Sequence, residues 1–213
     1  MNISVIKVGG SLLDWNETVD RLTRVVFRSG DERSVMIVGG GKAVDRIRAI
    51  DRARGLGEER SHRSALYALD ITARRFAERI KASRTRGFRC EIAADFASLE
   101  SHWDRGVTPI LPPRRVLDEV EASGERPLEH SWRVTSDSIA LWIAKRLNAR
   151  RLVLLKSVDP PADASIDRCR DLGLVDESFS SLFDPSIQVL FYNLRSGSSA
   201  FLNGESAIKT STA

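Results

Sequence analysis

The fold of this chain follows from two stretches of the same design, Ile3-Ser-Val-Ile-Lys-Val-Gly-Gly-Ser11 and Ser34-Val-Met-Ile-Val-Gly-Gly-Gly-Lys42. Each is an apolar, β-branched run that ends in glycines and leads into a polar helix start, which indicates a buried strand followed by a tight turn. Such a turn places free backbone N–H groups and the positive end of a helix at the carboxyl edge of a sheet, where phosphate binds. Two of these turns, each with a lysine beside it, predict a protein that handles two phosphate groups.

Composition indicates an ordinary globular protein rather than a membrane or secreted one. The 213 residues suit a single domain, 42% of them are hydrophobic, and no apolar run approaches the ~20 residues of a membrane span. The first residues have a strand pattern, not that of a cleaved signal peptide. Cys90 and Cys169 lack CxxC spacing, which argues against a disulfide framework and favours the reducing cytoplasm.

Basic residues gather between positions 60 and 89, within a chain of formal net charge +4. The segment could bind nucleic acid, form the solvated face of a long helix, or attract an anionic small molecule. Few aromatic residues are interleaved for base stacking, so we expect no nucleic-acid partner. The three histidines are scattered, so we expect no metal site built from protein ligands.

Strand and helix signals alternate along the chain. We expect strands at 3–8, 35–38, 90–93, 107–111, 151–155 and 187–192, and helices from 14 to about 30, from 43 to 50, from 61 to 84 and from 135 to 147. The polar segment 159–184 is expected to be irregular. Near-continuous apolar strands separated by helices predict an α/β protein with a largely parallel sheet, whose ligands bind at the carboxyl ends of the strands.

Neither glycine turn fits the two best-known phosphate fingerprints. A Walker loop requires glycine where Met36 stands and Ser or Thr where Ala43 stands. The dinucleotide fingerprint requires a small residue where Val44 stands. The chain is therefore expected to be neither a P-loop nor a Rossmann protein.

Two charged residues in apolar surroundings have both a structural and a functional interpretation. Lys7 could lie on an outward face and extend to water, or it could stabilise charge on a transferring phosphoryl group. Asp137 is expected in the first turn of a helix, where a carboxylate stabilises the helix end. It could instead hold catalytic lysines through charge-assisted hydrogen bonds.

Four motifs in this order resemble those of the amino acid kinase superfamily: Lys7-Val-Gly-Gly-Ser11, Val38-Gly-Gly-Gly-Lys42, Thr135-Ser-Asp-Ser-Ile-Ala140 and Leu154-Leu-Lys-Ser-Val-Asp159. The resemblance implies a three-layer αβα sandwich and the use of ATP with Mg²⁺. It implies catalytic roles for Lys7 and Asp137, and ATP binding by Gly9, Gly10, Ser11, Lys156 and Asp159. It assigns the acceptor to Gly39, Gly40 and Gly41.

The chain departs from that superfamily late in its sequence. Larger members carry a Gly-Gly-Met-x-x-Lys-like segment that supplies a second catalytic lysine, and nothing like it occurs at 159–184. Lys156 or Lys209 could substitute. The resemblance thus implies one domain over 1–213, with an acceptor-binding half at about 1–134 and a shortened nucleotide-binding half at about 135–213. Relatives are mostly homo-oligomers, so we expect a dimer or larger assembly.

Two further runs, Pro109-Ile-Leu-Pro-Pro113 and the segment 128–140, are similar to a branch of small kinases associated with methanofuran biosynthesis. That branch phosphorylates an aminomethylfuran-methyl phosphate, which makes His130, Trp132 and Arg133 candidates to contact the acceptor. Trp132 could equally anchor its loop on the sheet. We expect an ATP-dependent kinase with a phosphomonoester acceptor. A carboxylate or carbamate kinase, or a non-catalytic nucleotide-binding or metabolite-binding protein, remains open.

Overall fold

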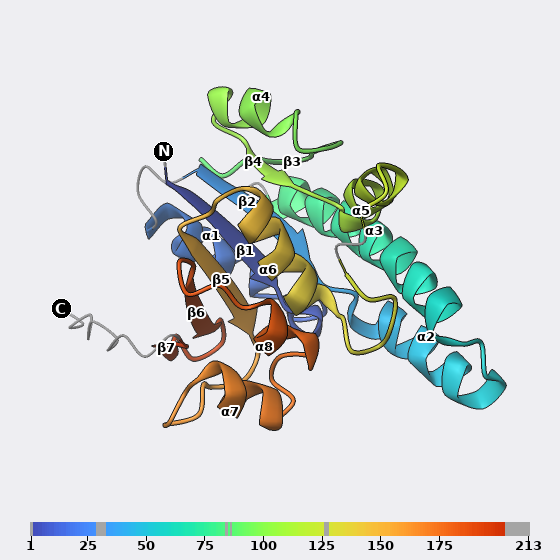
Figure 1. Cartoon of the computed structure of the whole chain (residues 1–213). Helices are drawn as coiled ribbons and strands as arrows, with labels where there is room; N and C mark the ends of the chain where they lie inside the picture. Colours follow the sequence, from blue (N-terminus) through green and yellow to red (C-terminus); the bar gives the residue numbers. More distant parts are fainter. Residues whose placement is uncertain (1, 29–32, 84, 86, 126–127, 203–213) are drawn as a thin grey trace.

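A seven-stranded sheet runs through the centre of the molecule in the order β3-β4-β2-β1-β5-β6-β7 (Figure 1). The computed structural model describes residues 2–28, 33–83, 85, 87–125 and 128–202. Strands β1 to β6 are parallel to their neighbours and β7 is antiparallel to β6. The expectation of a largely parallel sheet is confirmed. The strands are β1 Ile3–Val8, β2 Arg33–Val38, β3 Cys90–Ile92, β4 Thr108–Ile110, β5 Arg151–Lys156, β6 Gln188–Asn193 and β7 Ser199–Phe201.

Helices connect the strands, and four of the described α-helices, at 99–104, 113–122, 166–171 and 178–182, lie where the sequence predicts none. The segment 159–184 is not simply irregular, because it contains α7 and α8, and Ser165 caps α7 by accepting a hydrogen bond from the Arg168 N–H. No helix among the described residues is long and apolar enough to cross a bilayer. The helices are η1 Gly10–Leu12, α1 Thr18–Arg28, α2 Gly41–Arg54, α3 Glu58–Ser83, α4 Leu99–Asp104, α5 Pro113–Ala122, α6 Ser136–Arg146, α7 Ile166–Asp171 and α8 Ser178–Leu182.

The start of α1 also differs from the sequence expectation. Capping-box spacing predicts a helix from Asp14, but α1 begins at Thr18 after the short helix η1. The Asp14 carboxylate instead pairs with the Lys42 ammonium at 2.9 Å, so it joins the two glycine turns rather than capping α1. Thr18 stabilises the new start, because its hydroxyl donates to the Trp15 carbonyl at 2.8 Å.

Apolar side chains on the two faces of the sheet form two separate cores. Alternation along β1 sends Val5 to the core that contains α6, and Ile6 to the core that contains α1. Helix α3 is long enough to contribute side chains to both cores, because Leu69 belongs to the first core and Phe76 to the second. Helices therefore cover both faces, which confirms the three-layer αβα sandwich.

The same alternation determines where two lysines lie. Lys7 follows Val5 by two residues, and Lys156 follows Leu154 by two, so both lysines are on the α6 side of the sheet. Lys7 stands opposite Leu154 in the pairing of β1 with β5. In the sheet, β2 lies on one side of β1 and β5 lies on the other, so the strand order reverses between β1 and β5. Such a reversal is a topological switch point, and parallel sheets bind ligands there. Both lysines lie at this point.

Candidate active site

The two glycine turns touch each other through their backbones at the carboxyl edge of the sheet. A Cβ atom on Gly10 would lie 2.4 Å from the Gly41 nitrogen, and one on Gly39 would lie 2.8 Å from the Gly10 nitrogen. Each turn is also tied to the neighbouring strand, because Gly9 N–H donates to the Leu155 carbonyl and Gly39 N–H to that of Val8. The predicted pair of phosphate-binding turns is therefore one continuous backbone surface.

The second turn leads directly into α2. Gly41, the first residue of α2, has φ +51°, a left-handed conformation that favours glycine. No described side chain caps α2 through its N-cap residue Gly40. The first N–H groups and the positive end of this helix are thus available to an anion.

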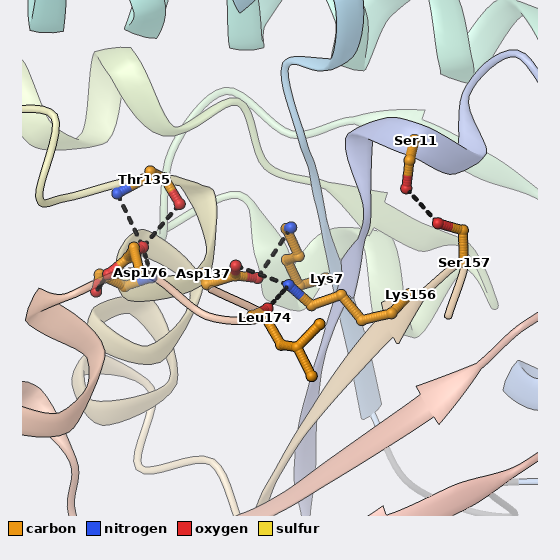
Figure 2. Close-up of polar contacts among 9 residues, drawn as sticks. Lys7, Ser11, Thr135, Asp137, Lys156, Ser157, Leu174 and Asp176 are labelled. Carbon is orange, nitrogen blue, oxygen red and sulfur yellow. Dashed lines mark hydrogen bonds and ion pairs between the residues drawn. The ribbon is translucent and has the colours of Figure 1, made fainter. Parts of the chain in front are cut away.

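A carboxylate lies between two lysines that come from β1 and β5, as Figure 2 shows. Asp137, in the first turn of α6, places Oδ1 2.9 Å from the Nζ of Lys7 and Oδ2 2.8 Å from the Nζ of Lys156. Lys156 also donates to the Leu174 carbonyl at 2.6 Å. The side chains of Lys7, Asp137 and Lys156 are 5%, 8% and 13% exposed, so Lys7 does not extend to bulk water.

This cluster places two lysines and one carboxylate in a buried place. Burial alone would raise the pKa of Asp137, but Lys156 and Lys7 outweigh it and lower that pKa to about 2. Burial lowers the pKa of Lys156, and Lys7 lowers it further, while Asp137 and the more distant Asp176 oppose the shift. Lysine Nζ groups held in this way can donate charge-assisted hydrogen bonds to a phosphate.

A second carboxylate, Asp176, fixes the helix that carries Asp137. It lies between α7 and α8 and accepts hydrogen bonds from Thr135 N–H at 2.9 Å, from the Thr135 hydroxyl at 2.7 Å and from Ser138 N–H at 3.1 Å. The Ser138 hydroxyl donates to its other oxygen. Burial raises the pKa of Asp176, and the charge of Asp137 adds to that effect. Sequence reasoning missed Asp176, because it is 38 residues from Ser138 and no local pattern joins them.

The remaining residues predicted to bind ATP lie at the same edge of the sheet. The hydroxyl oxygens of Ser11 and Ser157 are 2.8 Å apart, so the first glycine turn and the end of β5 meet (Figure 2). Asp159 accepts hydrogen bonds from Asn193 at 2.7 Å and Ser196 at 2.5 Å, which fixes the turn between β6 and β7. The structure thus gives Asp159 a structural role in that turn, and its predicted contact with nucleotide stays a prediction.

A cavity of about 50 Å³ lies next to the second glycine turn. Trp132 lines it and also donates its indole N–H to the Asp51 carboxylate at 2.6 Å, so it anchors its loop on α2 rather than on the sheet, and its predicted contact with the acceptor stays a prediction. Sequence reasoning missed His62, although a histidine on the apolar side of α3 was a possible signal. The lining residues are Gly40, Val44, His62, Ala65, Leu66, Leu69, Trp132, Val134, Thr135, Ser136 and Ile139.

The other two predicted acceptor residues are engaged elsewhere. His130 lies between two carboxylates, with Nδ1 2.6 Å from Glu59 and Nε2 2.7 Å from Glu121. Arg133 pairs with Glu177 at 3.1 Å on the surface. Neither lines the cavity beside Gly40. Lys209, the alternative second lysine, lies outside the described residues.

A larger hollow, about 1230 Å³, lies elsewhere, between α3, α5 and α8. Five acidic residues line it together with two arginines, and neither this hollow nor the cavity beside Gly40 is lined by Lys7, Asp137 or Lys156. Carboxylates repel phosphate, so the smaller cavity, which adjoins the second glycine turn, is the better candidate for a phosphorylated ligand. Within the described residues, no group of three or more His, Cys, Asp or Glu could hold a metal ion.

The parallel sheet and the glycine turns at its carboxyl edge are typical of one class of protein. Its members are α/β proteins that bind phosphate at the switch point of the sheet. Solved structures of the same fold include aspartate kinase from Synechocystis, with a TM-score of 0.63 and 14% identity over 98% of this chain and 41% of that one. UMP kinase from Ureaplasma parvum matches with a TM-score of 0.62 and 14% identity, covering 93% of this chain and 92% of its own.

The family itself is shown by sequence. The Amino acid kinase family matches residues 2–163, and the chain belongs to that family of phosphotransferases. A curated relative, the [5-(aminomethyl)furan-3-yl]methyl phosphate kinase of Methanocaldococcus jannaschii, is 28% identical over 157 residues. The match covers 73% of this chain and 66% of that relative.

Proposed function

We propose that the protein transfers the γ-phosphoryl group of ATP to a small molecule that already carries a phosphate. The observation that carries this proposal is the buried Lys7–Asp137–Lys156 cluster, in which one carboxylate holds two lysines beside the first glycine turn. Such a site stabilises the negative charge that is spread over a transferring phosphoryl group. Membership of a kinase family supports the same reaction.

Lys7 and Lys156 are the catalytic cations of this proposal, and Asp137 holds them at a fixed separation. Lys156 takes the part of the second lysine, because its Nζ lies 2.8 Å from the carboxylate that also binds Lys7. It reaches that place from the end of β5, so a rigid strand replaces the late segment that larger relatives use. A phosphate acceptor needs no general base, since its oxygen is already ionised near neutral pH.

The donor and acceptor have separate places on the backbone surface. Gly9, Gly10 and Ser11 would hold the phosphates of ATP, with Lys156 and Asp159 nearby, in a nucleotide-binding half of about 135–213. Gly39, Gly40 and Gly41 at the uncapped start of α2 would hold the acceptor phosphate, in a half of about 1–134. Mg²⁺ would screen charge on the phosphates, and phosphate oxygens would hold it, because Asp137 already binds two lysines.

The name of the curated relative suggests the acceptor, [5-(aminomethyl)furan-3-yl]methyl phosphate. The cavity beside Gly40 supports an acceptor of this kind, because Trp132 and apolar side chains line it next to the proposed phosphate position. Trp132 would contact the acceptor directly. His130 and Arg133 would act on the acceptor only through the loop that they help to hold.

The direct test is phosphoryl transfer from labelled ATP with Mg²⁺ to a panel of acceptors. The panel contains the aminomethylfuran phosphate, UMP, isopentenyl phosphate, carbamate and acetylglutamate. We expect transfer to a phosphomonoester, and transfer slowed by about 100-fold in Lys7→Met. Lys145→Met is the matched control, because Lys145 lies on α6 but points to the Leu182 carbonyl. Transfer only to a carboxylate or carbamate, or ATP binding without transfer, would contradict the proposal.

We also infer that the protein forms a homo-oligomer in the cytoplasm. Tyr67 and Ile71 lie one helical turn apart on α3 and are 59% and 56% exposed, which suits burial against a second copy. Cys90 and Cys169 are free thiols, as expected in a reducing compartment. Light scattering on the purified chain tests the first inference, and a monomer at micromolar concentration would contradict it.

A further inference from the structure

We propose that the cavity beside Gly40 binds a small flat ring of the acceptor, and that His62 selects a ring that carries a hydrogen-bond donor. This inference rests on the proposed function, because it specifies the acceptor of the same site. It concerns His62, which lies outside all four family motifs.

The size of the cavity limits what can enter. A buried water needs roughly 10–15 Å³ of such space, so a cavity of about 50 Å³ holds a ligand of only a few heavy atoms. A five-membered ring has that size, whereas a nucleoside does not. The site therefore rejects nucleoside monophosphates, although UMP kinases share the fold.

The walls of the cavity suit a flat ring. Most of the lining is apolar, and Trp132 adds an aromatic side chain. The indole is held on two sides, because its N–H donates to Asp51 and the Arg48 guanidinium lies 4.7 Å from its ring centre. A wall that is already fixed loses little conformational entropy when a ligand binds.

His62 supplies a hydrogen-bond acceptor within this apolar lining. It is 4% exposed, and its Nδ1 makes a long contact of 3.4 Å with the Ser131 carbonyl. A carbonyl can only accept, so Nδ1 carries the hydrogen, and Nε2 is left with a free lone pair. Nε2 has no hydrogen-bond partner among the described residues, so a ligand N–H or O–H can donate to it.

The surroundings of His62 keep its imidazole neutral. Burial lowers the pKa of His62, and His130, stacked on it at 4.8 Å between ring centres, lowers it further. The Ser131 carbonyl, Glu121 and Glu59 oppose these effects without reversing them. A neutral ring accepts a hydrogen bond, whereas an imidazolium cannot.

The position of the cavity connects the ring to the chemistry. Gly40 belongs both to the cavity lining and to the second glycine turn, and Ser136 of the lining precedes Asp137. A ring in the cavity therefore directs a phosphate-bearing substituent toward the start of α2 and the two lysines. The ring fixes the acceptor in place, and the backbone surface receives its phosphate.

The test compares two acceptors with two proteins. The acceptors are [5-(aminomethyl)furan-3-yl]methyl phosphate and its analogue with methyl in place of aminomethyl, and the proteins are the unaltered chain and His62→Phe. A hydrogen bond to one polar group accounts for about tenfold or more in kcat/KM. We expect the unaltered chain to prefer the donor-bearing acceptor by that factor, and His62→Phe to lose most of the preference.

Two further variants separate recognition from folding. His62→Gln keeps a hydrogen-bond acceptor and should retain part of the preference. His102→Phe is the matched control, because His102 is another buried histidine, held by the Ser98 carbonyl at 2.7 Å on α4. It should leave the preference unchanged.

Unchanged preference in a folded His62→Phe, no preference in the unaltered chain, or efficient transfer to UMP would each overturn the inference. The proposed function would survive all three results, since each still includes phosphoryl transfer to a phosphomonoester. Absence of transfer to every acceptor, with ATP still bound, would instead contradict the proposed function itself.

Discussion

Two ionic clusters in this protein have opposite composition. At the sheet edge, one carboxylate, Asp137, lies between Lys7 and Lys156. Between α3 and α5, one imidazole, His130, lies between Glu59 and Glu121. The first cluster has two basic side chains to one carboxylate, and the second has two carboxylates to one imidazole. Both arrangements fix a loop or a helix start, but only the first presents two lysine ammonium groups of the kind that bind phosphate.

Burial explains why the two clusters have different consequences. The Glu59 side chain is 59% exposed and also pairs with Arg63 at 2.5 Å, so water and a neighbouring cation offset its charge. Asp137 and its lysines are nearly out of contact with water, where an unbalanced charge is costly. A bound anion would relieve that cost, so we propose the buried cluster as the ligand site, whereas the exposed one ties α3 to α5 and the loop that carries His130.

The largest effect is expected from Asp137→Asn. Removing one member of a buried ion pair costs about 3–5 kcal/mol, because the remaining charges lose their partner. We expect kcat to fall by about 1000-fold or more, together with a lower melting temperature. Phosphoryl transfer and calorimetry measure the two effects. Glu121→Gln in the exposed cluster is the control, and an equal loss of activity there would remove the distinction between the clusters.

The next largest effects are expected when Lys7 and Lys156 are replaced one at a time. Lys7→Met and Lys156→Met should each lower kcat by about 100-fold, as loss of one positioned charge often does. Steady-state kinetics with saturating ATP measure this. If Lys156→Met keeps near-normal kcat, the second cation comes from elsewhere, and Lys156 only supports the α7–α8 segment through Leu174.

Asp176→Asn should produce a smaller loss. The amide keeps one hydrogen-bond acceptor but presents N–H groups where Thr135 and Ser138 donate, so the start of α6 must shift. We expect about a tenfold fall in kcat with little change in the KM for ATP. The loss should largely disappear in a Lys156→Met background, because Asp176 acts through the Asp137–Lys156 pair. Fully additive losses in the double variant would show that Asp176 contributes only to stability.

The smallest effect belongs to the exposed cluster and depends on pH. Burial of the ring lowers the pKa of His130, but Glu121 and Glu59 more than compensate, so this pKa is raised above 6.5. The stabilisation of the folded state by protonated His130 is therefore complete below about pH 6.5. It is lost as the pH rises through the raised pKa that His130 has in the folded state. We expect less than about 1 kcal/mol. Melting temperatures from pH 6 to 9 should fall more in the unaltered chain than in His130→Gln, and parallel curves would contradict this.

The sequence predicts the sheet well, and it singles out Lys7, Asp137 and Lys156, which the structure brings together, because both predictions depend on local patterns. Apolar runs that end in glycine place β1 and β2, and the order of the motifs places Asp137 near Lys156. The environment of His130, in contrast, depends on contacts between segments that are distant in the sequence. His130 is next to the motif in sequence, yet its partners Glu59 and Glu121 come from helices that sequence alone does not position. Asp176 and His62 were missed for the same reason, since their roles arise from contacts between distant segments.

The contact between Gly10 and Gly41 has a consequence for altering this protein. Because the two turns meet backbone to backbone, the distance between the proposed donor and acceptor phosphates would be set by backbone packing rather than by side-chain choice. Substitution of surrounding side chains would then leave this distance unchanged. An engineered change of substrate should therefore begin at the cavity lining, where the ligand can be exchanged without resetting the reach of the transfer step.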